Sequence, residues 1–124
     1  MGEDFHPAQP IYLQLVDRIC REIVRGDRKP GDRLPSVRDM AVQAGVNPNT
    51  VQRVYTELER MQVVLTRRGQ GTFVTEDAER LRALRADLMH GRIAAFVQDM
   101  EEMGFTGDEI VRGVQAFVEG GTRE

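Results

Sequence analysis

Residues 34–74 decide the fold, and they read LPSVRDMAVQAGVNPNTVQRVYTELERMQVVLTRRGQGTFV. Ser36 stands where a helix N-cap belongs, and it predicts a short helix over residues 37–44. After the link Gly-Val, Asn47 caps a second helix that we expect over residues 47–60, with a proline at its first position, where no N–H is needed. Two helices joined by so short a link are typical of a helix-turn-helix.

Two further elements flank this pair of helices. The β-like runs at residues 63–67 and 72–75 enclose the turn 68–71 and predict a hairpin. On the other side, apolar residues recur at helical spacing over residues 11–25. This order of elements predicts a mainly helical chain with a small β-hairpin, in which residues 1–75 form an N-terminal winged helix-turn-helix domain.

The second helix of the pair presents a polar face with an unusual composition. Asn49, Gln52, Arg53 and Thr56 follow one another at helical spacing, and Arg53 carries the only charge among them. Amide, guanidinium and hydroxyl groups are those that hydrogen-bond to base edges in the DNA major groove. The alternative is an ordinary solvated helix face, although such faces usually carry more Glu and Lys.

The turn Arg68-Gly69-Gln70-Gly71 also has two interpretations. Its glycines suit the unusual backbone angles of a hairpin turn. A small basic tip would in addition approach the DNA minor groove, whose negative potential attracts arginine. The two interpretations are compatible.

Composition bounds the remaining function classes. The 124 residues carry a net charge of −3, but the 11 basic and 9 acidic side chains of residues 1–75 make that part slightly basic. The single cysteine, the absence of a long apolar run and a polar N-terminus predict a soluble cytoplasmic protein without a membrane segment. We expect no metal site and no cofactor, and no motif of a catalytic triad, metalloprotease or P-loop predicts an enzyme.

The pattern of residues 76–124 predicts two helices, over about 78–103 and 106–118. A capping box at Thr106 to Glu109 starts the second helix, and Gly91 is a point at which the first helix can bend. Helices of about 40 residues in total cannot enclose their own apolar faces. We therefore expect a dimerisation region, the alternative being packing on the N-terminal domain. The methionines of this region suit core packing, and the alternative is an adaptable pocket for a ligand. The expected contact residues are Leu81, Leu84, Leu88, Ile93, Phe96, Met100, Ile110, Val114 and Phe117.

Over residues 9–75 the chain resembles the DNA-binding domain of the GntR family of bacterial transcription regulators. The resemblance rests on the opening PIYLQLVDRICREIVRGDRKPGDRLPSVRDMA and on the segments NPNTV and RRGQGTFV. The tail, with its segment MGFTGDEI, is similar to the YtrA subfamily, whose tail is two helices. Some members carry arginine where this chain has Pro48 and Gln52, so their operator sequence need not apply.

The resemblance implies DNA contacts from three places. These are the helix over residues 37–44, the recognition helix over residues 47–60, and the wing, which is the hairpin with its tip at residues 68–71. The candidate DNA-contacting residues are Arg38, Asn47, Asn49, Thr50, Gln52, Arg53, Arg68, Gly69 and Gln70.

The residues and the resemblance together predict a homodimeric transcription regulator, a repressor, that binds an inverted-repeat operator in double-stranded DNA. The resemblance also implies control of a transport operon. A small-molecule effector is a further expectation, without a predicted identity. The alternative function is a winged-helix protein–protein adaptor that does not bind DNA, for which acidic residues on the face of Asn49, Gln52 and Arg53 would be expected.

Overall fold

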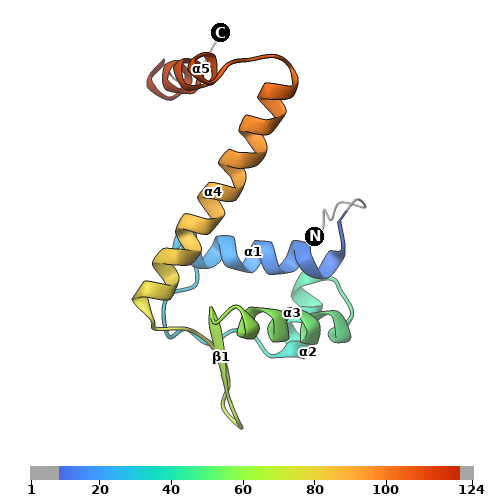
Figure 1. The fold of residues 1–124 in the computed structure, drawn as a ribbon. Coiled ribbons are helices and arrows are strands. Elements are labelled where there is room, and N and C mark those ends of the chain that lie inside the picture. The colour runs from blue at the N-terminus through green and yellow to red at the C-terminus, as the bar shows by residue number, and fades with distance from the viewer. Residues whose placement is uncertain (1–8, 121–124) are drawn as a thin grey trace. The chain divides into compact units, whose positions relative to one another are not determined.

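The computed structural model describes residues 9–120, which form five helices and one two-stranded sheet (Figure 1). The chain divides into two compact units, with the boundary between Arg85 and Ala86. This boundary falls later than the predicted one at residue 75, because the first turns of the long helix α4 (Ala78–Glu102) belong to the N-terminal unit.

The N-terminal unit is built on three helices, α1 (Ile11–Arg25), α2 (Val37–Ala44) and α3 (Pro48–Arg60), as the sequence predicts. Their apolar faces meet in one core, in which Leu15, Ile19, Val51, Val54 and Leu58 are at most 1% exposed. The predicted caps are present as well: the Ser36 side chain accepts a hydrogen bond from Asp39 N, and the Asn47 side chain accepts one from Asn49 N. The mainly helical fold class is thereby confirmed.

The strands β1 (Val64–Arg67) and β2 (Gly71–Val74) pair antiparallel, from Val64 opposite Val74 to Arg67 opposite Gly71. A third segment, which the sequence did not predict, lies against β2: Leu34 N donates to Thr72 O at 2.8 Å, and Arg33 forms an isolated bridge with Phe73. The hairpin is therefore anchored at its base, while its tip extends beyond the helices of this unit (Figure 1).

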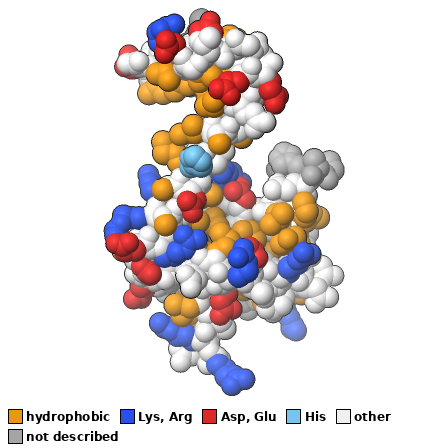
Figure 2. Space-filling view, viewed as in Figure 1, with side chains coloured by type: hydrophobic (Ala, Val, Ile, Leu, Met, Phe, Trp, Pro, Cys, Tyr) orange, Lys and Arg blue, Asp and Glu red, His pale blue; other side chains and the backbone are white. Residues whose placement is uncertain are grey.

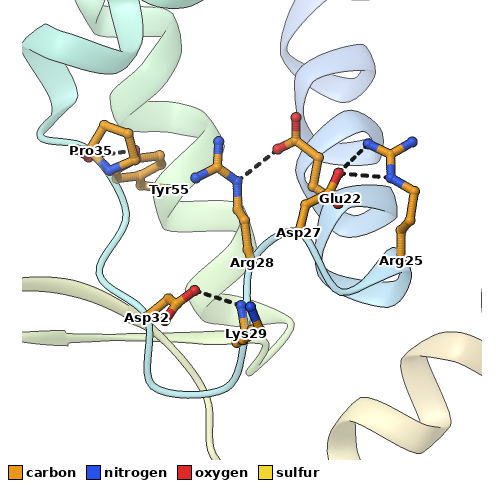
Figure 3. A network of polar contacts seen from close by, with 8 residues as sticks. All are labelled: Glu22, Arg25, Asp27, Arg28, Lys29, Asp32, Pro35 and Tyr55. Atoms are coloured by element: carbon orange, nitrogen blue, oxygen red, sulfur yellow. Dashed lines mark hydrogen bonds and ion pairs between the residues drawn. The ribbon is translucent and has the colours of Figure 1, made fainter.

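The loop between α1 and α2 is held by polar contacts that position the start of α2 (Figure 3). Arg28 Nε donates to Glu22 Oε1 at 2.7 Å, and Lys29 N donates to Asp32 Oδ2 at 2.8 Å. From α3, the Tyr55 hydroxyl donates to Pro35 O at 2.6 Å, which ties the two helices of the helix-turn-helix together.

The first turns of α4 change the predicted dimerisation set. Leu84 is only 2% exposed within the chain, and Arg80 Nε and Arg85 Nη1 nearby donate to Met61 O and Val24 O. Leu84 therefore packs in the N-terminal unit, and we correct the predicted set by removing it. Leu81 is half-buried in the same unit, beside Ile23 and Val24.

The C-terminal unit contains the rest of α4 and helix α5 (Gly107–Gly120). The predicted capping box is present: Thr106 N donates to Glu109 Oε1 at 2.9 Å, and Glu109 N donates to Thr106 Oγ1 at 3.2 Å. Helix α4 continues through Gly91 without a break in its helical assignment. Within residues 9–120, no helix combines the length and apolarity that crossing a membrane requires.

Candidate nucleic-acid interface

The outer face of α3 is exposed to solvent. Asn49, Gln52, Arg53 and Thr56 are all exposed, whereas Val51, Val54, Tyr55 and Leu58 on the opposite side are buried. This division follows from the helical period, because residues three and four apart share a face. We call these four exposed residues, Asn49, Gln52, Arg53 and Thr56, the reading face.

The N-terminus of α3 adds a fixed positive potential beside the reading face. The Oδ1 atom of Asn47 accepts the Asn49 N–H at 2.7 Å, and Thr50 N donates to Asn47 O at 2.9 Å. The amide NH₂ of Asn47 stays a donor on an exposed side chain, while Thr50 is half-buried. Helix N-termini attract anions, so this end of α3 suits a DNA phosphate.

Arg38 lies near the start of α2 and is exposed. At the tip of the hairpin, Arg68, Gly69 and Gln70 are exposed as well, and the turn is closed by Gln70 N donating to Arg67 O at 2.8 Å. Gly69 has φ +78°, a left-handed conformation that glycine adopts at little cost. The space-filling view shows basic side chains at this tip (Figure 2).

These elements are assembled as in a known regulator family. Residues 11–74 match the model of the bacterial regulatory proteins of the gntR family. The chain belongs to the GntR family.

Relatives over the whole length support the membership. The HTH-type transcriptional regulator YhcF of Bacillus subtilis is 49% identical, over 98% of this chain and 100% of its own. The transcriptional repressor YtrA of the same organism is 32% identical, over 97% of this chain and 95% of its own. A GntR-family regulator from Listeria monocytogenes is 39% identical in sequence and superposes with a TM-score of 0.84, covering 90% of this chain and 97% of that one.

Membership fixes the class of the protein. GntR-family proteins are DNA-binding transcriptional regulators and not enzymes, so this chain is a DNA-binding transcriptional regulator. A DNA-binding domain of AraR, 27% identical with a TM-score of 0.53 over 60% of this chain, is known in complex with its operator. The resemblance inferred from the sequence motifs is thereby confirmed.

Two arginines at the hairpin, Arg33 beside β2 and Arg67 on β1, make contacts that the sequence did not predict. Arg33 Nε lies only 2.6 Å from the place where a Cβ on Gly71 would stand, so the absence of a side chain at Gly71 makes room for Arg33. The Arg67 guanidinium lies 5.2 Å from the ring centroid of Phe73. Helical or strand periodicity could not predict either contact. Each depends on strand pairing, which brings Arg33 to β2 and places Arg67 and Phe73 on neighbouring strands.

Arg53 is exposed as expected, but it makes a contact that the sequence did not predict. Its guanidinium carbon lies 3.7 Å from the ring centroid of Tyr12 on α1. The side chain is exposed, and this cation–π contact connects the reading face to α1.

The C-terminal unit presents an apolar surface of its own. A groove of about 370 Å³ is lined by Phe96, Met100, Ile110, Val114 and Phe117, all predicted dimerisation residues. Ile110 is buried at 5% exposure and forms part of the floor, whereas Phe96, Val114 and Phe117 are 42%, 43% and 65% exposed. Apolar side chains also gather on the visible surface of this unit in Figure 2.

Proposed function

We propose that this chain is a homodimeric repressor that binds an inverted-repeat operator. Each protomer inserts the reading face of α3 into the major groove and directs the tip of the hairpin β1–β2 into the adjacent minor groove. The observation that carries the proposal is the reading face itself. Its residues are exposed, its amides match adenine edges, and no acidic side chain belongs to it.

Dimerisation is supported by the apolar surface of the C-terminal unit. Single exposed apolar residues are ordinary, but a contiguous patch indicates an interaction surface. Besides the groove residues, Ile93 is 48% exposed on α4, and Met89 one turn before it is 65% exposed, while the predicted contact residue Leu88 is half-buried. A second copy would cover this surface. Two reading faces on one operator would then lie about one duplex turn, roughly 34 Å, apart.

The proposed sign of regulation rests on a relative. YtrA of Bacillus subtilis, which matches nearly the whole chain, is named a transcriptional repressor. A small-molecule effector would have to compete with the second protomer for the groove of the C-terminal unit. The residues that line this groove are the ones that the second protomer would cover. An effector bound there would weaken the dimer, and with it operator binding.

Gel-shift titration of the promoter of the chain's own gene, over a series of salt concentrations, tests the proposal. We expect tighter binding to this promoter than to a random duplex of equal length, with an affinity that falls as salt rises. Gln52→Ala should reduce the preference, while Gln98→Ala on the C-terminal unit serves as a matched control. Equal binding of wild-type protein to both duplexes at every salt concentration would contradict operator recognition and would favour the adaptor alternative.

A further inference from the structure

We infer that Tyr12 is a positioning residue that holds Arg53 at the edge of the reading face, where its guanidinium contacts a backbone phosphate rather than a base. The inference rests on the proposed operator binding and deepens it. It differs from the sequence expectation that the guanidinium on this face hydrogen-bonds to a base edge. The inference depends on one contact: the guanidinium of Arg53 lies over the ring of Tyr12, with 3.7 Å between the Arg53 Cζ atom and the ring centroid.

The helical period places Arg53 and Gln52 on opposite sides of Asn49, and it is the contact with Tyr12 that distinguishes Arg53 from Gln52. At about 100° per residue, Arg53 is rotated roughly 40° from Asn49 in one direction, and Gln52 roughly 60° in the other. Because Tyr12 lies on α1, the contact draws the guanidinium further toward the α1 side of the face. In a major groove, the centre of the helix faces the base edges and its flanks face the sugar–phosphate chains. A guanidinium held at the flank therefore meets phosphate.

The stacked arrangement leaves the donors of Arg53 available. Stacking uses the π face of the guanidinium, while its N–H groups lie in the plane and point outward. Bidentate donation to a phosphate is thus compatible with the ring contact. The carboxylate one turn further along α3, Glu57, is engaged by Arg60, whose Nε donates to Glu57 Oε1 at 3.0 Å.

The half-buried position of Tyr12 gives the ring a fixed place. A side chain as long as arginine loses rotational freedom when it binds, and a ring that restricts it beforehand reduces that loss. Tyr12 would therefore increase affinity for DNA without touching a base, and its effect would be the same for every sequence.

The test compares Arg53→Ala, Tyr12→Leu and the double variant, each titrated with operator and with random duplex over a salt series. Arg53→Ala should weaken both duplexes by the same factor and should reduce the salt slope by about 0.9, the value for one phosphate contact. Tyr12→Leu should weaken both by about two- to five-fold. In a protein that already carries Arg53→Ala, Tyr12→Leu should not lower the affinity for either duplex any further, because the two residues act as one unit.

Two further variants separate positioning from folding. Tyr12→Phe retains the ring and should recover the binding that Tyr12→Leu loses. Ile11→Ala, which removes an exposed side chain from the same turn of α1, should leave the salt slope unchanged. Thermal unfolding of each variant shows whether the domain is still folded.

Three results would overturn the inference while leaving operator binding intact. The first is a loss of preference at a single base pair in Arg53→Ala, which would make Arg53 a base reader. The second is independent effects of Tyr12→Leu and Arg53→Ala. The third is tighter binding by Tyr12→Leu, which would mean that the ring withholds Arg53 from DNA. If wild-type protein itself shows no preference, the proposed function fails instead.

Discussion

Gly71 shows how one residue without a side chain shapes the wing. Its φ of +127° lies in a region that residues with a Cβ rarely adopt, and a Cβ there would stand 2.6 Å from Arg33 Nε. Strain of this kind costs about 1–3 kcal/mol. We expect Gly71→Ala to destabilise the domain by about that amount and to displace Arg33, as thermal unfolding and the NMR signals of the Arg33 side chain would show.

Gly69 provides the matched control for Gly71. It also has a positive φ, +78°, but a Cβ there would meet nothing within 4 Å. Gly69→Ala should therefore cost only the backbone strain, about 1 kcal/mol, and should leave the Arg33 signals unchanged. Equal losses of stability in the two variants would show that the Arg33 contact has no consequence.

Tyr55 makes the stability of the helix-turn-helix depend on pH. Burial raises the pKa of Tyr55 to about 12, and the nearby charge of Arg28 opposes this only partly. In the unfolded chain the Tyr55 hydroxyl ionises at about pH 10. The stability that Tyr55 contributes is therefore fully present below about pH 10 and is lost as the pH rises toward the folded pKa.

Tyr55→Phe removes both this titration and the hydrogen bond to Pro35 O. At neutral pH we expect the free energy of unfolding to fall by about 1 kcal/mol. Between pH 10 and 12 it should fall less steeply for the variant than for wild type, as denaturant titrations at each pH would measure. Cys20, whose pKa burial raises to about 11, is present in both proteins and cancels in the comparison. Parallel pH profiles would contradict the assignment.

At the scale of elements, local chemistry predicted the helices well. Ser36, Asn47 and Thr106 each accept the backbone N–H that a cap should accept, so helix starts could be read from the sequence. The third segment of the sheet could not, because Arg33 and Leu34 pair with β2 across a long sequence separation. The contact of Arg53 with Tyr12 escaped prediction for the same reason, as helical periodicity describes only one helix at a time.

The helix α4 shows the limit of a periodic pattern. Leu84 and Phe96 both belong to apolar seams, yet Leu84 is 2% exposed within the chain and Phe96 is 42% exposed. The sequence predicted that these residues would be covered, but a seam does not reveal whether the covering surface comes from the same chain or from a partner.

The capping box of α5 gives a prediction for this element. Thr106→Ala removes the oxygen that accepts Glu109 N, and it should destabilise the start of α5 by about 1 kcal/mol. Faster amide hydrogen exchange confined to the first turn of α5 would be the measurement. Thr106→Ser keeps the hydroxyl and should exchange as wild type does; equal exchange in both variants would show that the cap contributes nothing.

At the level of the whole molecule, the proposed dimer depends on the C-terminal unit. Phe117 is 65% exposed in the single chain, so Phe117→Glu has little reason to unfold it. A buried aromatic residue at an interface often contributes about 2 kcal/mol or more, so we expect at least about tenfold weaker dimerisation by sedimentation. Gln115→Glu adds the same charge about 160° around α5 from Phe117, on an exposed residue outside the groove lining, and should leave the dimer intact. A Phe117→Glu protein that dimerises like wild type would remove this groove from the interface.

Selection of binding sites from a random pool of DNA duplexes tests most directly whether two reading faces recognise DNA as a pair. Paired recognition should enrich an inverted repeat whose half-site centres lie about 10 base pairs, or a multiple of that spacing, apart. Recovery of unenriched DNA, or of a single half-site bound by one protomer, would contradict it.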